Sequence, residues 1–362
     1  MNNDTEPVTN EAIINENNTG SDNNTNIIKE LRRDANVNGI LLLLFFVIQF
    51  SATFALRAVG KYLMTDFSDQ SKQNILTLIL YIIMYPVGMP LLFFVFRKIS
   101  CKYKDQKIKD CFKKPLMPTG WVVKWIVITI GICYLTTYVS NIFFLIIESI
   151  TKIKLNPAEF STDTSSPISI LTYVLALPFF APFFEELFFR GTIYRNVRKY
   201  GPWSMIIISG IIFGLWHLNY QQMIYAAVMG IFACLVFEKT QSIIPTMIVH
   251  FIVNSIGFFQ LMILSGLDIE KIQAGDTSEL FAHPVRLLLL AGMGVVIFAF
   301  IITAIVLLII ELVNHRDSFK PEYKCRELTG GKSFLVFITS PVMAVALLFM
   351  IGMTAFYAFT GR

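Results

Sequence analysis

Long apolar segments separated by short polar stretches make up most of this chain. An apolar α-helix of about 20 residues crosses a hydrocarbon core of about 30 Å. Nine segments come close to that length or exceed it, namely residues 39–56, 75–96, 122–147, 167–189, 203–219, 222–238, 243–264, 286–310 and 334–358. The pattern therefore predicts an all-α fold, a polytopic membrane helix bundle with about nine transmembrane helices.

The predicted spans form three groups behind a polar segment. Residues 1–38 are rich in Asn, Glu and Thr and contain no long apolar run, so we expect a disordered cytoplasmic tail there. They also lack the basic and apolar regions of a cleavable signal peptide. Three N-terminal spans follow within residues 39–147, a core of four spans within 167–264, and two C-terminal spans within 286–358.

The composition excludes an ordinary soluble protein. Hydrophobic residues make up 55% of the 362 positions and charged residues only 15%, with a mean hydropathy of +0.61. A soluble domain has about 25% charged residues. The five cysteines are odd in number and have no metal-type spacing, so free thiols are expected. We expect the two loop histidines, His283 and His315, to be ordinary solvated residues.

Membrane topology explains the net charge of +5 better than binding to nucleic acid does. The basic residues cluster in short loops beside apolar segments and are not interleaved with exposed aromatics, so no nucleic acid is expected. The most basic loop is 97–114, and the positive-inside rule then places the N-terminus in the cytoplasm. The abundance of Asn, Ile and Lys is typical of an AT-rich genome and favours a bacterial plasma membrane. The expected environment is the lipid bilayer.

Ionisable groups enter the apolar run of the predicted fourth span. Glu185 and Glu186 directly follow an apolar stretch that contains Pro178 and Pro182, which remove backbone donors and free carbonyl groups. Glu186 and Arg190 are four residues apart and share a helix face, so an ion pair is predicted between them. Glu185 points about 100° away from that pair. Since charged groups inside a membrane are costly, each needs a structural or functional reason.

Two further spans carry polar side chains. His217 lies near the end of the fifth span, where Gly210 and Gly214 have the spacing that lets another helix approach closely. His250 and Asn254 are four residues apart in the seventh span and project from the same face. Polar groups on membrane helices face the bundle interior. We therefore expect these side chains to converge with the acids of the fourth span.

A glutamate, two histidines and an asparagine in a partly dry cavity suit hydrolysis. Glu185 can act as general base for a water that His217 positions. His250 and Asn254 can donate hydrogen bonds to the oxyanion of a tetrahedral intermediate. The same residue types can also bind zinc, because two His and one Glu form a known catalytic ligand set, here Glu185, His217 and His250. The spacing does not separate a metal-free mechanism from a zinc mechanism.

The three motifs together resemble a known family. They are Glu185-Glu186-x-x-x-Arg190, Phe213-x-x-x-His217 and His250-x-x-x-Asn254. In type and order they resemble the motifs of the CPBP intramembrane proteases, which comprise the type II CAAX prenyl endopeptidases and the Abi or bacteriocin-processing proteins. The resemblance covers about residues 167–264.

This resemblance implies a glutamate-type endopeptidase without a cofactor, although zinc has also been considered for the family. It assigns Glu185 and His217 to water activation and His250 and Asn254 to the oxyanion hole, with Glu186, Arg190 and Phe213 in support. The implied substrate is a peptide or membrane protein, with prenylated CAAX-type chains among the candidates.

Two other classes of function stay open. A non-proteolytic membrane scaffold or bacteriocin-immunity protein uses the same fold without chemistry, and a secondary transporter uses His and Glu as a proton relay. Depth along the helices also constrains the site. If the fourth span ended at residue 189, Glu185 would lie near the cytoplasmic end, whereas His217 lies about 21 Å along the next helix. Either the fourth helix continues through about Lys199, or the fifth span starts deeper and residues 217–222 form a break buried in the protein. We favour the long fourth helix, because Gly201-Pro202 is the first firm stop signal after it.

Overall fold

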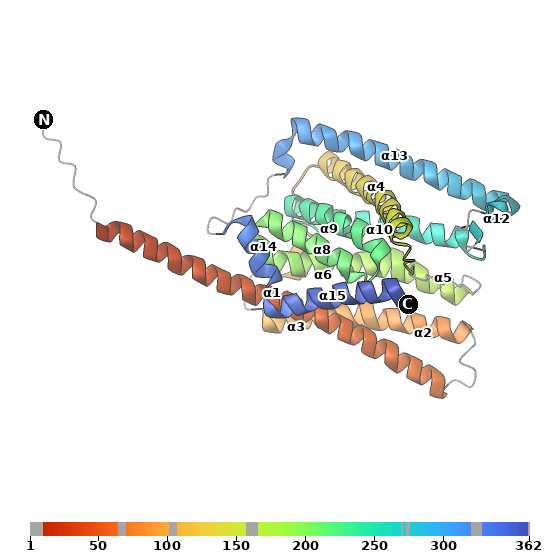
Figure 1. The fold of residues 1–362 in the computed structure, drawn as a ribbon, viewed down its shortest axis with the longest axis horizontal. Coiled ribbons are helices and arrows are strands. Elements are labelled where there is room, and N and C mark those ends of the chain that lie inside the picture. The colour runs from red at the N-terminus through yellow and green to blue at the C-terminus, as the bar shows by residue number, and fades with distance from the viewer. Residues whose placement is uncertain are drawn as a thin grey trace.

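The structure is a computed structural model that describes residues 10–63, 70–100, 107–156, 166–268, 271–272, 276–319 and 328–360. The described residues form helices joined by loops and turns, and no described residue lies in a β-strand. This agrees with the all-α prediction. The long helices lie side by side in a bundle, with α13 at one edge and α1 and α2 at the opposite edge (Figure 1).

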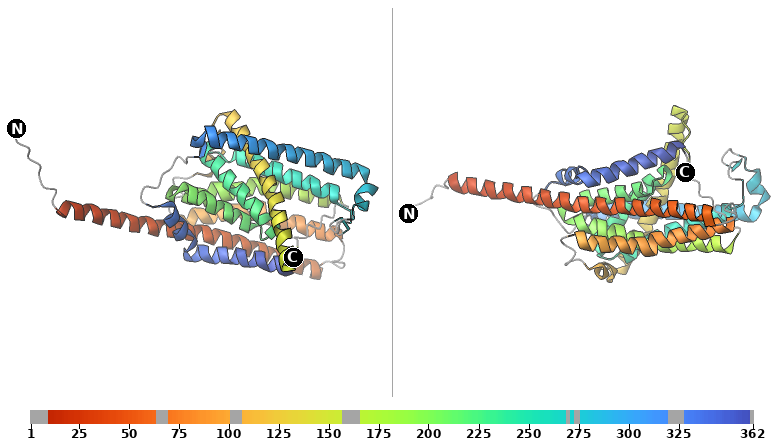
Figure 2. Two further views of the ribbon diagram at one scale, coloured as in Figure 1. Left: turned by 45° about the horizontal axis from the view of Figure 1, so that its top comes forward. Right: turned by 90° about the horizontal axis from the view of Figure 1, so that it is seen from below.

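The helices of the N-terminal half are bounded as follows: α1 Asn10–Leu63, α2 Gln70–Ile82, η1 Ile83–Gly88, α3 Met89–Ile99, η3 Ile108–Phe112, α4 Thr119–Thr151, α5 Pro167–Val174 and η4 Leu175–Glu185. The remaining ones are α6 Glu186–Phe188, η5 Phe189–Tyr194, α7 Arg195–Val197, η6 Arg198–Tyr200, α8 Pro202–Trp216, α9 Tyr220–Thr240, α10 Ile244–Leu264, α12 Ser278–Ala282, α13 Pro284–Asn314, η7 Arg316–Phe319, α14 Gly330–Ile338 and α15 Pro341–Thr360. Figure 2 shows the arrangement of these helices from two further directions.

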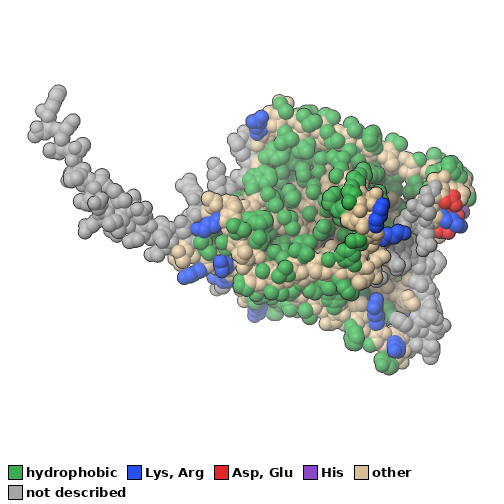
Figure 3. All heavy atoms as spheres, viewed as in Figure 1, with side chains coloured by type: hydrophobic (Ala, Val, Ile, Leu, Met, Phe, Trp, Pro, Cys, Tyr) green, Lys and Arg blue, Asp and Glu red, His purple; other side chains and the backbone are tan. Residues whose placement is uncertain are grey.

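Eight helices in the described part of the chain are long and apolar enough to span a membrane. The expected number was about nine, and the difference lies at the predicted fifth span, 203–219. That segment forms α8, whose 15 residues extend only about 22 Å. Hydrophobic side chains cover the middle of the bundle on the face in Figure 3, and most charged side chains in view lie near its two ends. The protein is therefore an integral, multi-pass membrane protein.

The start of the first span differs from the prediction. The sequence predicts disorder over residues 1–38, whereas α1 is already helical at Asn10; residues 1–9 lie outside the described part. Leu31 and Ala35 are fully buried, and they are four residues apart on one helix face. The amide of Asn38 donates to the Ile193 carbonyl at 3.0 Å. A narrow apolar face and paired polar groups thus stabilise a helix that composition alone does not indicate.

Close packing between α8 and α9 depends on glycines. A Cβ atom at Gly214 would lie 2.2 Å from the carbonyl oxygen of Met223, and one at Gly210 would lie 2.4 Å from the side chain of Ile231. No larger residue fits at either position without moving a helix. The close approach predicted from the Gly210 and Gly214 spacing is therefore present, and it draws the end of α8 into the bundle.

The described cysteines and the loop histidines agree with expectation. Cys111, Cys133 and Cys234 are buried free thiols, whereas the predictions for the other two cysteines fall outside the described residues. The side chains of His283 and His315 are 46% and 57% exposed. Neither histidine lies in the bundle interior.

Candidate active site

The fourth membrane helix is long, as the depth argument requires. It runs from Pro167 to Tyr200 over 34 residues and ends at Gly201, whose φ of +130° is a conformation that glycine adopts without strain. Pro202 then begins α8. Glu185 consequently lies near the middle of the helix rather than at its end, and the expected continuation through about Lys199 is confirmed.

Part of this helix has π-helical geometry. The segment η4 contains Pro178 and Pro182 and ends at Glu185. In a π-helix the carbonyl of residue 177 accepts from the N–H of residue 182, which is a proline and has none. The Leu177 carbonyl instead accepts a hydrogen bond of 2.9 Å from Nδ2 of Asn254 on α10. The prolines therefore free a carbonyl group that fixes the orientation of Asn254.

Glu186 and Arg190 form the predicted ion pair inside the protein. Arg190 Nη1 lies 2.9 Å from Glu186 Oε1, and both side chains are fully buried. Arg190 Nη2 donates to the Gly230 carbonyl on α9 at 3.3 Å. The same oxygen of Glu186 accepts from Nδ1 of His250 at 3.0 Å. Glu186 thus holds an arginine from its own helix and a histidine from α10 in fixed positions.

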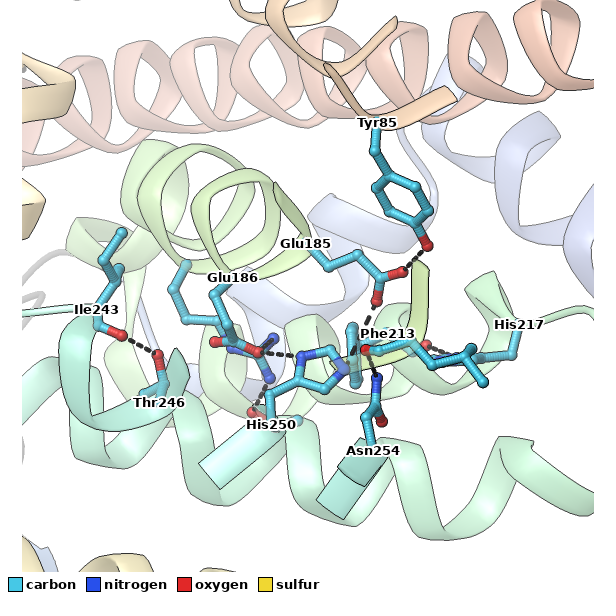
Figure 4. A network of polar contacts seen from close by, with 12 residues as sticks. Tyr85, Glu185, Glu186, Phe213, His217, Ile243, Thr246, His250 and Asn254 are labelled. Carbon is cyan, nitrogen blue, oxygen red and sulfur yellow. Dashed lines mark hydrogen bonds and ion pairs between the residues drawn. The ribbon is translucent and has the colours of Figure 1, made fainter. Parts of the chain in front are cut away.

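Glu185 has two differently placed oxygens. Its Oε1 accepts a hydrogen bond of 2.6 Å from the hydroxyl of Tyr85, which lies on η1 in the second membrane helix. Its Oε2 is buried, has no hydrogen-bond partner among the described residues, and lies 4.0 Å from Nε2 of His250 (Figure 4). One oxygen therefore orients the carboxylate, and the other has unused acceptor capacity.

Phe213 and His217 come from the last turns of α8. His217 Nδ1 lies 2.8 Å from the Phe213 carbonyl, so Nδ1 is the donor and Nε2 of the neutral ring is an acceptor. The Phe213 ring packs edge-on against the rings of His217 and His250, and the Arg190 guanidinium lies 4.6 Å from its centroid. Phe213 therefore spaces both histidines and contacts the arginine.

These groups share one cavity of about 220 Å³. Its wall includes Glu185, His217, His250 and Asn254, and Tyr85 lies in it too. The rest of the lining consists mainly of aromatic and aliphatic side chains, and it includes two polar ones, Gln49 on α1 and Gln222 on α9. The arrangement brings all four predicted catalytic residues to one enclosure and leaves Glu186 and Arg190 behind them.

A loop from the most basic segment covers the start of α10. The amide of Ile243 donates to the Cys111 carbonyl at 2.8 Å, and the amide of Leu116 donates to the Thr240 carbonyl at 2.9 Å. Burial raises the pKa of the Cys111 thiol, and the positive charge of Arg195 opposes this shift. The two hydrogen bonds tie this loop to the turn between α9 and α10.

The zinc ligand set inferred from sequence does not fit this geometry. In the described part of the chain no group of three His, Cys, Asp or Glu side chains is placed to hold a metal ion. We therefore derive no step through a metal.

Sequence reasoning missed Tyr85. It lies outside the region that carries the three motifs, in an apolar span where a tyrosine before a proline has no distinctive pattern. The tyrosine is brought to Glu185 by the packing of η1 against η4. The sequence indicates that the Glu185 carboxylate lies within a membrane span. It does not indicate that η1 supplies the hydrogen-bond donor, the hydroxyl of Tyr85.

The fold and the site together define a polytopic membrane protein in which Glu, His and Asn side chains share a cavity inside the helix bundle. Residues 167–256 match the model of the family described as type II CAAX prenyl endopeptidase Rce1-like. This match confirms the resemblance to the CPBP intramembrane proteases over about a quarter of the chain, and it supports a CAAX endopeptidase-type enzyme. No curated protein and no solved structure matches the chain significantly.

Proposed function

We propose that this protein is an intramembrane endopeptidase that hydrolyses a peptide bond with water activated by Glu185 and His217. One observation carries the proposal: a buried carboxylate, held at one oxygen by Tyr85, presents its other oxygen without a protein hydrogen bond beside His250. Glu186 Oε2 and Glu238 Oε1 are also buried without a hydrogen-bond partner among the described residues, but of these three carboxylates only Glu185 lines the cavity. The family match over residues 167–256 supports the same activity.

The chemistry proposed for Glu185 is that of a general base and then a general acid. Oε2 accepts a proton from water while the water oxygen bonds to the carbonyl carbon of the scissile peptide. His217 Nε2 accepts the second hydrogen bond of the same water and orients it. The proton then passes from Glu185 to the leaving nitrogen, the carbon–nitrogen bond breaks, and a carboxylic acid and an amine are released.

His250 and Asn254 are proposed to stabilise the oxyanion. Nδ1 of His250 donates to a carboxylate that can only accept, so Nε2 is a second donor when the ring is charged. Asn254 uses one amide hydrogen on Leu177 and retains another. Each such donor contributes about 3 kcal/mol to the transition state in characterised enzymes. The fixed partners on Glu186 and Leu177 place both donors before substrate binds.

The proposed substrates are peptides or membrane proteins, with prenylated CAAX-type chains included because the matched family is named for them. The proposed location is a bacterial plasma membrane with the N-terminus in the cytoplasm, which the basic loop at 97–114 supports.

Purified wild-type protein incubated with a peptide library, including farnesylated CAAX peptides, tests the activity. We expect product peptides by mass spectrometry, in equal yield with and without a zinc chelator, because no metal step is proposed. Loss of cleavage on chelation, restored by zinc, would contradict the metal-free mechanism. A folded protein that cleaves no peptide would favour the scaffold or immunity alternative, and proton-coupled flux without products would favour a transporter.

Replacement of Tyr85 by Phe tests how Glu185 is held. A hydrogen bond to a charged group contributes about 1.5–3 kcal/mol, so Tyr85→Phe should lower kcat about 10- to 100-fold with KM little changed. The matched control is Tyr138→Phe, since Tyr138 is 49% exposed on α4. Steady-state kinetics on one cleaved peptide provides the comparison. An unchanged kcat would show that the 2.6 Å contact does not orient the base.

A further inference from the structure

A cavity of about 580 Å³ lies between α1 and α2, at the edge of the bundle that these two helices form in Figure 1. This volume is within the usual range of ligand pockets. Each helix contributes one face to the lining, with Thr53, Leu56, Arg57 and Lys61 from α1 and Gln73, Leu76, Thr77 and Leu80 from α2. None of these residues lines the cavity of the candidate active site, and both helices lie outside the region that the family model matches.

Charged and apolar groups lie at different depths in this cavity. Lys61 is in the last turn of α1, and Arg57 is one turn before it. Because α1 and α2 are consecutive spans joined by a short connection, the end of α1 and the start of α2 lie on the same side of the membrane. Leu80 lies roughly 15 Å along α2 from that side, at 1.5 Å per residue. The cations are therefore at the level of the lipid headgroups, and the cavity becomes apolar towards the hydrocarbon core.

No protein group among the described residues neutralises the two cations. Neither Arg57 nor Lys61 takes part in an ion pair with a described residue, and no described residue in the lining is acidic. Both side chains are exposed. If the N-terminus is cytoplasmic, as proposed above, this end of α1 lies on the opposite side, where the positive-inside rule predicts few basic residues. Topology therefore does not account for this pair of charges, and an external anion does.

We propose that this cavity binds an anionic phospholipid of the surrounding bilayer. Its phosphate lies between Arg57 and Lys61, and the upper parts of its acyl chains pack against Leu76 and Leu80. A guanidinium can donate two parallel hydrogen bonds to a phosphate, and an ammonium adds a compact positive charge. The leucines add apolar contact that a free phosphate cannot use. Since the site shares no residue with the candidate active site, this inference does not depend on the proposed peptide hydrolysis.

Native mass spectrometry of the full-length protein in detergent tests the proposal. The protein is titrated with dioleoyl phosphatidylglycerol, which is anionic, or with dioleoyl phosphatidylcholine, which has the same chains and no net charge. Each basic residue near an anionic headgroup contributes about fivefold in affinity. We therefore expect one phosphatidylglycerol to bind roughly 25-fold more tightly than phosphatidylcholine, from two such residues. Arg57→Gln combined with Lys61→Gln should remove this preference, and each single variant should weaken it about fivefold.

The matched control is Lys152→Gln combined with Lys154→Gln, which changes the net charge equally. Both lysines are exposed and follow α4, which is the third span and so ends on the same side as α1. This control should keep the preference of wild type. Thermal unfolding identifies the variants that fold, and the single variants keep the test valid if the double variant does not.

Three results would overturn the proposal. Equal affinity of wild type for the two lipids would show that the cavity does not recognise the anionic headgroup. An equal loss of the preference in the control would show that the attraction depends on net charge rather than on this cavity. Displacement of phosphatidylglycerol by an equal concentration of glycerol phosphate would show that the ligand is a soluble phosphate and not a lipid.

Discussion

Glu185→Gln should reduce peptide hydrolysis about 100- to 10,000-fold, the range over which a positioned general acid or base accelerates such reactions. The amide of glutamine cannot take a proton from water at neutral pH. Glutamine nevertheless keeps a carbonyl oxygen for the Tyr85 hydroxyl and nearly the same volume. The fold should therefore remain, with an unfolding midpoint close to that of wild type.

The matched control for this variant is Glu148→Gln. Glu148 lies on α4, where its Oε1 accepts from the Leu155 amide at 2.8 Å. The same chemical change there leaves that acceptor in place and should leave hydrolysis unchanged. Rates of product formation and thermal unfolding should be measured for both variants in the same detergent. Full activity of Glu185→Gln would remove Glu185 from the role of base.

The hydrophobic pattern predicted most of the fold because membrane spans are specified by length and apolarity alone. It placed a span at each of the eight long helices, but the last predicted span, 334–358, joined the end of α14 to α15. It also could not show that α1 continues into a polar segment. That continuation depends on partners such as Ile193, which accepts from Asn38 across the bundle. The shortness of α8 follows from Pro202 at one end and the turn at His217 at the other, so hydropathy alone overestimated it.

The three motifs predicted which of their own residues share a helix face in the candidate site, but they did not predict the contacts between helices. Helical spacing placed Glu186 beside Arg190 and His250 beside Asn254, and both pairs share a face in the structure. Spacing did not predict the hydrogen bond between Glu186 and His250. It also did not predict that Asn254 donates to a backbone carbonyl freed by a proline, or that Tyr85 donates to Glu185. These contacts link different helices. The placement of polar residues predicted that three of the helices converge, but it did not indicate which side-chain atoms pair or that the second membrane helix contributes Tyr85.

Arg190→Ala should lower the free energy of unfolding by about 3–5 kcal/mol, the usual cost of removing one member of a buried ion pair. Arg190 and Glu186 are both fully buried, so the variant leaves a carboxylate in the bundle interior with only His250 to pair it. The substitution also removes the guanidinium from the Phe213 ring and from the Gly230 carbonyl. Chemical denaturation in detergent, followed by circular dichroism, measures the loss.

Arg57→Ala is the matched control, because Arg57 is exposed on α1 and should change stability by no more than about 0.5 kcal/mol. The double variant Glu186→Gln with Arg190→Met removes both charges together. It should recover part of the lost stability, since a neutral pair needs no compensation in a low-dielectric interior. Recovery of stability without recovery of hydrolysis would separate the two functions of Glu186, pairing with Arg190 and positioning His250. If Arg190→Ala unfolded like wild type but cleaved no peptide, Arg190 would act on the substrate rather than on the fold.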